Sequence, residues 1–335
     1  MATTGTSGRG HDLRGGIDLG GTKIQAVIVD ARGNVVGQDR QATPLDGGPE
    51  AVVAAMAIAV RNAAQAAGVR PSELTGVGVG APGAIDAAAG TVAQPPNLPW
   101  QDAFPLGPKL AKTLGAAVVV DNDVRVATTA EFALGAGRDY RSLLGVFWGT
   151  GVGGGIILNG EPWHGRGAAG EIGHTIVHPG GALCGCGRRG HLEAYAGRGN
   201  MEMEARKKIK EGTKSVLLKI TEERGISRMT SGVWARALEH GDKLAQHLID
   251  RAVEALGIGI ASAATLLDVE AVIIGGGLGL RLGQPYVDRI AELVRPQVFV
   301  RDRPPAILLA ALGDLGGAIG AALLVERAAP ARATA

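Results

Sequence analysis

Apolar, β-branched runs separated by glycine turns open the chain. The segment RGGIDLGGTKIQAVIVDARGNVVGQ, which starts at Arg14, places two such runs around LGGT and a third after ARGN, a pattern that predicts a three-strand meander. Residues 48–69 carry valines and a methionine at helical spacing in an alanine-rich background, which predicts a helix. The runs LTGVGVGAPG and AAVVVDND predict two further strands, separated by the loop QPPNLPW and a short helix near 108–114.

The second half repeats this opening theme. A predicted helix, VRVATTAEFALGAG, precedes the hairpin SLLGVFWGTGVGGGIILNG, which again consists of a strand, a glycine turn with a threonine, and a strand. Helices are expected from about 198 to 267, followed by the strand VEAVIIGGGLG and a helix around 287–294. The strand AILLAAL and the helix GGAIGAALLVERA complete the pattern. The order of elements predicts an α/β protein with two lobes built on one plan.

Composition narrows the class of protein. A chain of 335 residues can bury two cores without disulfides, and 34 Lys and Arg against 32 Asp and Glu leave no long run of one sign. We therefore expect no nucleic-acid or membrane partner. The longest apolar stretches, such as ALGIGIASAATLL, are too short to span a bilayer, and the N-terminus lacks the apolar core of a signal peptide. The two cysteines, in a Cys-x-Cys pair, suit a reducing cytoplasm.

Three glycine clusters are candidates for ligand contact. Gly149, Gly151 and Gly154 fit G-x-G-x-x-G, but a strand follows them instead of the helix that a dinucleotide fingerprint requires. A Walker A sequence is absent, because no G-K-[ST] occurs. The turns DLGGTK and WGTGVGG are tight β-turns, or they surround a polyphosphate with amides and threonine hydroxyls, Lys23 adding charge. The third cluster, 275–279, would let a flat ligand lie against the backbone.

These motifs, in this order, resemble those of a known protein family. The segments IDLGGTKIQAVIVD, GVGAPGAID, PPNLPW, DNDVRVATTAE, WGTGVGGGI, GEIGH with CGCGRRGHLE, and VIIGGGL resemble the ROK family of sugar kinases and sugar-responsive repressors, from about Gly15 to Leu324. The resemblance implies an actin-like ATPase (ribonuclease H-like) fold with a ligand cleft between two lobes. The smaller lobe would comprise 13–122 with 312–328 packed back on it, and the larger 123–311. Residues 1–12 and 329–335 are expected to be flexible tails.

Asp123 is the candidate catalytic residue. Phosphoryl transfer to a hydroxyl needs a carboxylate that accepts the proton, a divalent cation, and donors around the transferred group. Asp123 ends a predicted strand where a helix begins, which is where open α/β sheets place ligand contacts. From the residues alone it could equally cap that helix. The resemblance makes Asp123 the general base and Asn122 a sugar ligand, and leaves Asp121 outside the matching Asn-Asp pair.

The resemblance also implies the remaining contacts. Asn97, otherwise an ordinary turn asparagine, would bind sugar hydroxyls, and Asp18, otherwise a buried strand carboxylate, would lie near the metal and the phosphates. The predicted ATP contacts are Asp18, Gly20, Gly21, Thr22, Lys23, Thr150, Gly151, Gly276 and Gly277.

The stretch GEIGHTIVHPGGALCGCGRRGHLEAY, residues 170–195, holds both cysteines. By itself it could be a metal site, a redox pair, a catalytic centre or a polar loop. Zinc prefers four tetrahedral N or S ligands. The family pattern has a histidine ten residues before Cys-x-Cys and a third cysteine five residues after it. The matching set here is His174, Cys184, Cys186 and His191, with a histidine in place of that cysteine, and His178 is a competing ligand.

Such a zinc site would be structural, because a fully ligated ion leaves no position for substrate. It would hold the loop that carries Glu171, His174 and Glu193, and the resemblance implies that these three side chains contact sugar hydroxyls. The alternative is that the carboxylates are merely exposed on solvated loops.

The sequence therefore predicts a cytoplasmic ATP- and Mg²⁺-dependent hexokinase of glycolysis, in particular a glucokinase acting on the 6-hydroxyl. Alternatives are another acceptor (N-acetylmannosamine, fructose or allose) or polyphosphate as donor. A sugar-responsive repressor is a further alternative. Repressors of the family carry an additional helix-turn-helix domain, whereas only a short glycine-rich segment precedes DLGGT here. The resemblance implies a homodimer or homotetramer.

Overall fold

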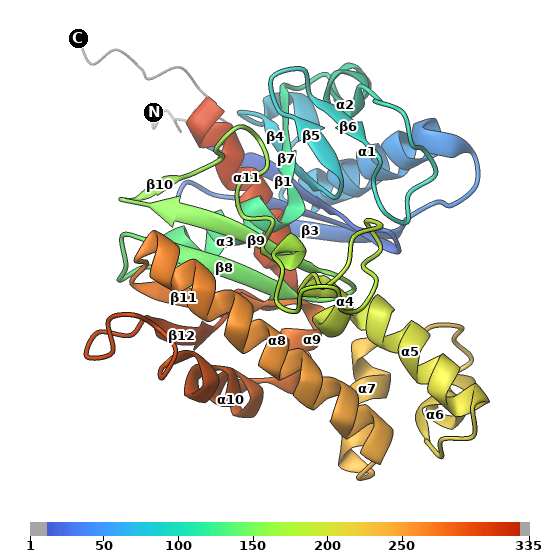
Figure 1. Ribbon diagram of the computed structural model, residues 1–335. Helices are drawn as coiled ribbons and strands as arrows, with labels where there is room; N and C mark the ends of the chain where they lie inside the picture. Colours follow the sequence, from blue (N-terminus) through green and yellow to red (C-terminus); the bar gives the residue numbers. More distant parts are fainter. Residues whose placement is uncertain (1–11, 329–335) are drawn as a thin grey trace, which may run out of the picture. The chain divides into compact units, whose positions relative to one another are not determined.

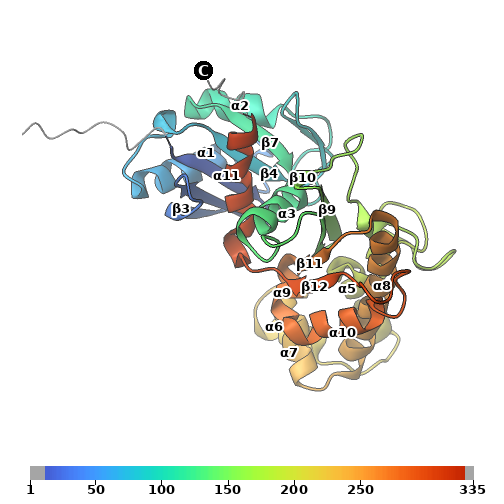
Figure 2. The same cartoon turned by 90° about the vertical axis from the view of Figure 1, so that its left-hand side faces the viewer.

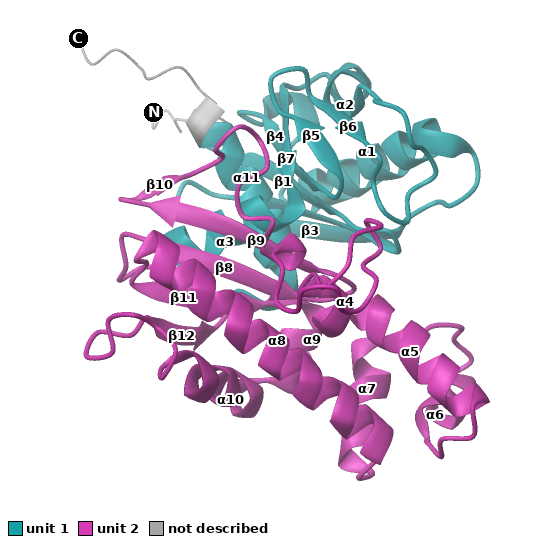
Figure 3. Cartoon of the chain, viewed as in Figure 1, with its two compact units in different colours: residues 1–134, 312–335 teal, residues 135–311 magenta. Residues whose placement is uncertain are grey.

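The computed structural model describes residues 12–328, which Figures 1 and 2 show in two views. Apart from Asp12, the predicted tails lie outside the described residues. The chain divides into two compact units: the first runs to Leu134 and resumes at Leu312, and the second is Gly135–Ala311 (Figure 3). Among the described residues, no helix combines the length and the apolar character needed to cross a bilayer.

The first unit is built on a five-stranded sheet in the order β3-β2-β1-β4-β7. The predicted meander is confirmed, because β1, β2 and β3 pair antiparallel, while β4 and β7 continue the sheet parallel to β1. The strands are β1 (Arg14–Leu19), β2 (Lys23–Val29), β3 (Val35–Ala42), β4 (Val77–Ala81) and β7 (Val118–Asn122).

Helices cover both faces of this sheet because the strand residues alternate between two cores. In β2, Ile24 and Ile28 pack with α1 and α2, whereas Val27 and Val29 face α11. Figure 2 shows α11 lying across its face of the sheet. The sequence did not predict the separate hairpin of β5 and β6. The elements are α1 (Gly48–Ala66), η1 (Pro71–Glu73), β5 (Ala84–Asp86), β6 (Thr91–Ala93), α2 (Leu106–Leu114), α3 (Asp123–Leu134), η3 (Gly313–Leu315) and α11 (Gly316–Ala328).

The helix α11 lies directly on strand backbone. A Cβ atom at Gly16 of β1 would lie 2.0 Å from the carbonyl oxygen of Ala318, and one at Gly78 of β4 would lie 1.7 Å from that of Ala321. No residue with a side chain fits at either crossing without moving the helix. The glycines of two strands therefore determine where the C-terminal helix rests.

The first unit extends beyond the predicted boundary at Asp123. The helix α3 belongs to it, because α3 packs along α11 with a close approach of Gly320 to the Val126 carbonyl. The buried carboxylate of Glu131 on α3 also accepts a hydrogen bond from the Leu312 amide (2.8 Å). The predicted start of the second lobe thus lies one helix too early.

The second unit repeats the sheet plan of the first, in the order β10-β9-β8-β11-β12. A hairpin, β8 and β9, is again followed by two strands, β11 and β12, that are parallel to the first strand of the hairpin. The strand that follows the Gly149 to Gly154 run is β9, as predicted. The strands are β8 (Leu143–Trp148), β9 (Val152–Leu158), β10 (Glu161–Pro162), β11 (Ala271–Gly275) and β12 (Ala306–Leu309).

Helices form much of this unit, and α8 is the longest of those described. The predicted strand VEAVIIGGGLG ends at Gly275, and its last glycines start α9, because Gly276 takes a positive φ of 80° against the backbone of Trp148. The helices are η2 (Ile172–His174), α4 (Glu193–Ala196), α5 (Arg198–Lys210), α6 (Leu217–Glu223), α7 (Ser231–Glu239), α8 (Lys243–Leu267), α9 (Gly276–Leu282) and α10 (Gln284–Val294).

Replacing Gly16 tests whether the close packing of α11 on β1 requires a glycine. We expect Gly16→Ala to lower the free energy of unfolding by about 3 kcal/mol or more, because its Cβ would meet backbone that cannot rotate away. Gly15→Ala is the matched control, since its Cβ would meet methyl groups of Val77 and Leu74 at 3.0 to 3.4 Å. Urea denaturation followed by circular dichroism gives both values. Equal losses of unfolding free energy for Gly16→Ala and Gly15→Ala would contradict the requirement for glycine beneath α11.

Candidate functional site

The carboxyl ends of β1, β4 and β7 meet at one edge of the first sheet because these strands are parallel. Asp18 of β1 pairs in register with Gly80 of β4, and a Cβ at Gly80 would lie 3.3 Å from the Asp123 Cα atom. Two of the predicted site residues, Asp18 and Asp123, are therefore brought to the same edge by the sheet itself.

Asp18 is held in a partly buried position beside the start of α11. A Cβ at Gly317 would lie 3.0 Å from its carboxyl carbon. Burial raises the pKa of Asp18, the positive charge of Lys23 lowers it, and the negative charge of Asp314 raises it further. Burial and Asp314 thus disfavour the ionised carboxylate, and a bound cation would offset both effects.

The predicted phosphate turn between β1 and β2 is closed by hydrogen bonds. The Gly20 amide donates to the Lys23 carbonyl (2.9 Å), and the Thr43 hydroxyl donates to the Gly20 carbonyl (2.7 Å). Asn97, exposed and at a positive φ of 63°, lies against this turn, since a Cβ at Gly21 would be 2.7 Å from the Asn97 Cβ. The structure thus places the predicted sugar-binding asparagine beside the predicted phosphate turn.

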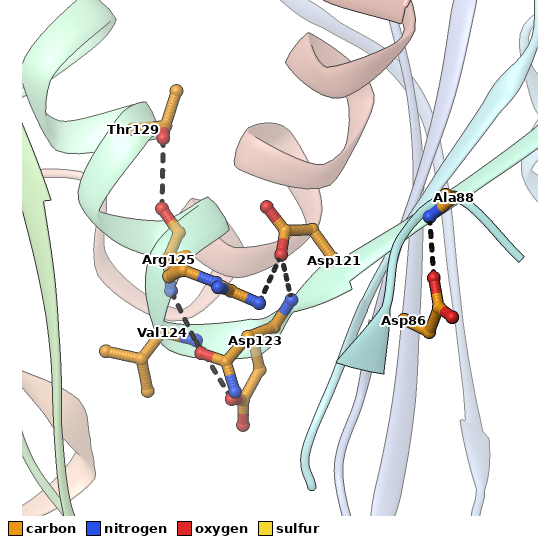
Figure 4. Close-up of polar contacts among 8 residues, drawn as sticks. Asp86, Ala88, Asp121, Asp123, Val124, Arg125 and Thr129 are labelled. Atoms are coloured by element: carbon orange, nitrogen blue, oxygen red, sulfur yellow. Dashed lines mark hydrogen bonds and ion pairs between the residues drawn. The ribbon is translucent and has the colours of Figure 1, made fainter. Parts of the chain in front are cut away.

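The two residues of the Asn-Asp pair at the end of β7 have different places in the structure: Asn122 caps α3, and Asp123 lies at the edge of the candidate site (Figure 4). The Asn122 side-chain oxygen accepts hydrogen bonds from the amides of Val124 (3.0 Å) and Arg125 (3.2 Å), so Asn122 caps α3. The capping role considered for Asp123 thus belongs mainly to Asn122. Asp123 is the first residue of α3, and its carboxylate accepts the Val124 amide (2.9 Å).

Asp121 is committed to a different partner. It forms an ion pair with Arg125 (2.8 Å), and each side chain is 11% exposed. It also accepts the Asn122 amide (2.7 Å). In Figure 4 the Asp123 carboxylate points away from this ion pair. Of the two neighbouring aspartates, Asp121 is structural, which agrees with its exclusion from the predicted catalytic pair.

In the second unit, two of the glycine clusters lie together. The turn of the β8–β9 hairpin is closed by a bond from the Gly149 amide to the Gly151 carbonyl (2.9 Å). A Cβ at Gly149 would be 3.8 Å from the Gly277 amide nitrogen at the start of α9. The predicted phosphate turn and the predicted nucleoside cluster are thus neighbours, although more than a hundred residues separate them in the sequence.

The four predicted metal ligands form one cluster. Their ligand atoms all lie within 4.8 Å of one another, with Cys184 Sγ 3.8 Å from His174 Nδ1 and Cys186 Sγ 3.3 Å from His191 Nδ1. Cys184 and His191 are buried, whereas His174 and Cys186 are exposed. Both cysteines are free thiols, and His178 does not belong to the cluster. Two thiols and two imidazoles at this spacing fit a four-coordinate zinc ion.

The two thiols differ in their environment. Burial raises the pKa of Cys184 to about 11, whereas the Arg188 backbone amide lowers the pKa of Cys186. A metal ion at this cluster would therefore have to displace the Cys184 proton, so its affinity would depend on pH.

Glu193, the first residue of α4, links the metal cluster to the glycine hairpin. One carboxylate oxygen, Oε2, accepts the Val152 amide (3.0 Å) at the start of β9, and Oε1 lies 3.8 Å from Cys184 Sγ. Glu171, by contrast, is exposed, and its carbonyl oxygen accepts the His174 amide (3.0 Å). The contact of Glu193 with the hairpin was not predicted, because nothing in the sequence pairs Glu193 with Val152.

Arg198 is a second contact that the sequence did not predict. Its guanidinium donates to the hydroxyl of Thr150 (2.7 Å), the predicted phosphate ligand of the hairpin. The only signal was its place five residues after Glu193, which by itself indicates no partner.

Comparison with known proteins agrees with this geometry. The model of the ROK family matches residues 14–328. A glucokinase of Halalkalibacterium halodurans is 33% identical over 93% of this chain and 94% of its own, and a glucokinase of Streptomyces coelicolor is 35% identical over 94% and 98%. A xylose repressor of Caldicellulosiruptor bescii is 26% identical over 85% of this chain and 70% of its own.

The fold has close counterparts among solved structures. A ROK family glucokinase of Streptomyces griseus in complex with glucose and AMPPNP matches 94% of this chain and 99% of its own, with 32% identity and a TM-score of 0.79. The predicted actin-like α/β fold is thereby confirmed.

Neutralising each aspartate in turn separates their roles. We expect Asp121→Asn to lower the free energy of unfolding by roughly 2 to 4 kcal/mol, because it removes the charge of Asp121 from its ion pair with the nearly buried Arg125. Asp123→Asn, two residues further along the chain, should lower the free energy of unfolding by less than about 1 kcal/mol. Thermal and urea denaturation measure both. A larger loss for Asp123→Asn would reverse this assignment.

Proposed function

The chain belongs to the ROK family, and we propose that it is an ATP-dependent hexokinase that phosphorylates the 6-hydroxyl of D-glucose. The observation that carries this proposal is the arrangement at the end of β7, where Asp121 is paired with Arg125 and the Asp123 carboxylate points away from this ion pair. The similarity to glucokinases over nearly the whole chain supports the choice of acceptor. The similarity to a glucokinase solved with AMPPNP supports the choice of donor.

In the first unit, Asp123 would accept the proton of the attacking hydroxyl as it approaches the phosphoryl group. Asn122 spends its side-chain oxygen on the amides of α3, so its NH₂ group is the part that would donate to a sugar hydroxyl. Asn97 would add a second sugar contact from its place against the Gly20–Gly21 turn.

In the second unit, Glu171, His174 and Glu193 would bind sugar hydroxyls. Glu193 would do so through Oε1, because Oε2 already accepts the Val152 amide. A glutamate that is fixed at one oxygen loses little rotamer freedom on binding, so it orients a hydroxyl more strictly than a freely rotating side chain.

The donor would be held by the glycine turns. The amides of Gly20 and Gly21 with the side chains of Thr22 and Lys23 suit phosphate groups, as do Thr150 and Gly151. Gly276 and Gly277 would let the nucleoside approach the backbone at the start of α9. Asp18 is the carboxylate that would hold the Mg²⁺ bound with ATP, and this ion would offset the charge of the phosphate groups.

The cluster of His174, Cys184, Cys186 and His191 would hold a structural zinc ion, which would link η2, the cysteine loop and the residues just before α4. Cytoplasmic location and assembly into a homodimer or homotetramer remain predictions from the sequence and its resemblance.

A coupled assay over sugars and phosphoryl donors tests the proposal. Glucose with ATP and Mg²⁺ should give the highest kcat/KM, ahead of N-acetylmannosamine, fructose and allose, and ATP should exceed polyphosphate as donor. Higher kcat/KM with another sugar or with polyphosphate would change the substrate, and absence of phosphorylation with every pair would refute the kinase and favour a sugar-sensing role.

Asp123→Asn is the control for the chemistry in that assay. It should keep glucose affinity, measured by calorimetry, while kcat falls about a hundredfold to ten-thousandfold, the usual contribution of a general base. Unchanged kcat would exclude Asp123 as the base.

Elemental analysis tests the metal cluster. We expect about one zinc per chain, as a closed four-ligand site implies. His191→Ala should lower zinc content and weaken glucose binding, because Glu193 follows His191 by two residues. His191→Cys, which restores the family residue, should retain zinc, and His178→Ala, outside the cluster, should change neither quantity. Full zinc content in His191→Ala would remove His191 from the ligand set.

A further inference from the structure

The start of α5 is bonded to the turn of the β8–β9 hairpin. The Arg198 amide donates to the Gly149 carbonyl (3.1 Å), and the Gly199 amide donates to the Thr150 carbonyl (2.9 Å). The Arg198 side chain adds two more bonds, from Nη2 to Thr150 Oγ1 (2.7 Å) and from Nη1 to the Met229 carbonyl (2.7 Å) before α7. One arginine therefore ties the hairpin to two helical segments.

The bond to Thr150 determines what its hydroxyl can do. A hydroxyl has one donor and two acceptor positions, whereas a guanidinium only donates. Thr150 Oγ1 must therefore accept from Arg198, which leaves the hydroxyl proton to donate elsewhere. A threonine in this state suits an anionic oxygen, and the adjoining positive charge strengthens the bond that it donates.

A second arginine lies close by. Burial lowers the pKa of Arg198, and the positive charge of Arg228 lowers it further, while Glu202 acts in the opposite direction. A Cβ at Gly199 would be 3.4 Å from the Thr150 carbonyl and 3.9 Å from a guanidinium nitrogen of Arg228. Arg228 also lines a hollow of about 390 Å³ with Gly199, Arg206 and Glu202, and in this lining Arg206 is paired with Glu202 (2.8 Å). Two guanidinium groups beside the hairpin favour a multiply charged anion there.

We propose that Arg198 is a positioning residue for the phosphoryl donor. It holds the Thr150 hydroxyl as a hydrogen-bond donor toward a phosphate oxygen, and together with Arg228 it supplies positive charge at the hairpin. The inference rests on the proposed function, because it assigns the hairpin to the donor and not to the sugar. A purely structural role for Arg198 would join the same segments without any preference for an anion.

Binding of ADP and of tripolyphosphate, measured by calorimetry, tests this role apart from turnover. Arg198→Met should weaken both affinities by about tenfold, the loss expected for a charge-assisted contact. Glucose affinity should change little. In turnover, KM for ATP should rise by a similar factor while KM for glucose stays the same. Arg198→Lys, which keeps the charge, should recover part of the loss.

A double-mutant cycle tests whether Arg198 acts through Thr150. Thr150→Val should weaken ADP binding. The double variant, Thr150→Val with Arg198→Met, should weaken ADP binding by a much smaller factor than the product of the two single factors. Lys210→Ala is the matched control, because it removes one exposed positive charge from the same helix and should leave ADP affinity unchanged.

The outcomes separate the two proposals. Wild-type protein that binds ADP and tripolyphosphate through Arg198 but phosphorylates no sugar would overturn the proposed function and keep the anion role. Arg198→Met with unchanged ADP affinity, or with equal losses of glucose and ADP binding, would overturn the positioning role. Should Arg198→Met not fold, Arg198→Lys and Thr150→Val decide by the same measurements: donor-specific weakening supports the role, and its absence refutes it.

Discussion

The rest of the first unit depends on the contact of α11 with the bare backbone of β1 and β4. Because Gly16 and Gly78 have no side chains, the helix rests directly on the strands, and α3 then packs along it. The position of α3 determines where Asn122 and Asp123 stand at the end of β7, and α11 also presents Gly317 to Asp18. The candidate site of this unit is thus placed by close packing at a distance from its carboxylates.

In the second unit, one carboxylate connects features that serve different purposes. Glu193 touches the hairpin through Val152 and the cysteine loop through Cys184, so the metal cluster and the glycine turn cannot shift independently. Through this carboxylate, a structural metal ion at the cluster would influence ligand binding even without an open coordination position. A distortion at the cluster would be transmitted to the hairpin across a single side chain.

The sequence predicted most of what depends on local pattern. Apolar runs indicated most strands of the two five-stranded sheets, and glycine turns indicated the β1–β2 and β8–β9 hairpins, because these features follow from backbone chemistry over a few residues. The grouping of His174, Cys184, Cys186 and His191 was predicted from the spacing of the family pattern, and the structure brings these four side chains together. Contacts between distant segments were not predictable in this way: Arg198 with Thr150, and Glu193 with Val152, arise only when the fold brings the pairs together. Asp121 and Arg125 are four residues apart, which is the spacing of an ion pair on a helix. Asp121, however, lies in the strand that precedes α3, so the sequence did not indicate this pair.

The histidine at position 191, where the family pattern has a cysteine, would change the charge of a zinc-bound cluster, and that would affect Glu193. Three thiolates and one imidazole around Zn²⁺ leave a net negative charge, whereas two thiolates and two imidazoles leave none. Because Glu193 Oε1 lies 3.8 Å from Cys184 Sγ, a negative cluster would repel the carboxylate. With His191 as a ligand of a bound zinc ion, that repulsion would be largely absent, so Glu193 could accept hydrogen bonds from Val152 and from a hydroxyl group without an opposing charge beside it.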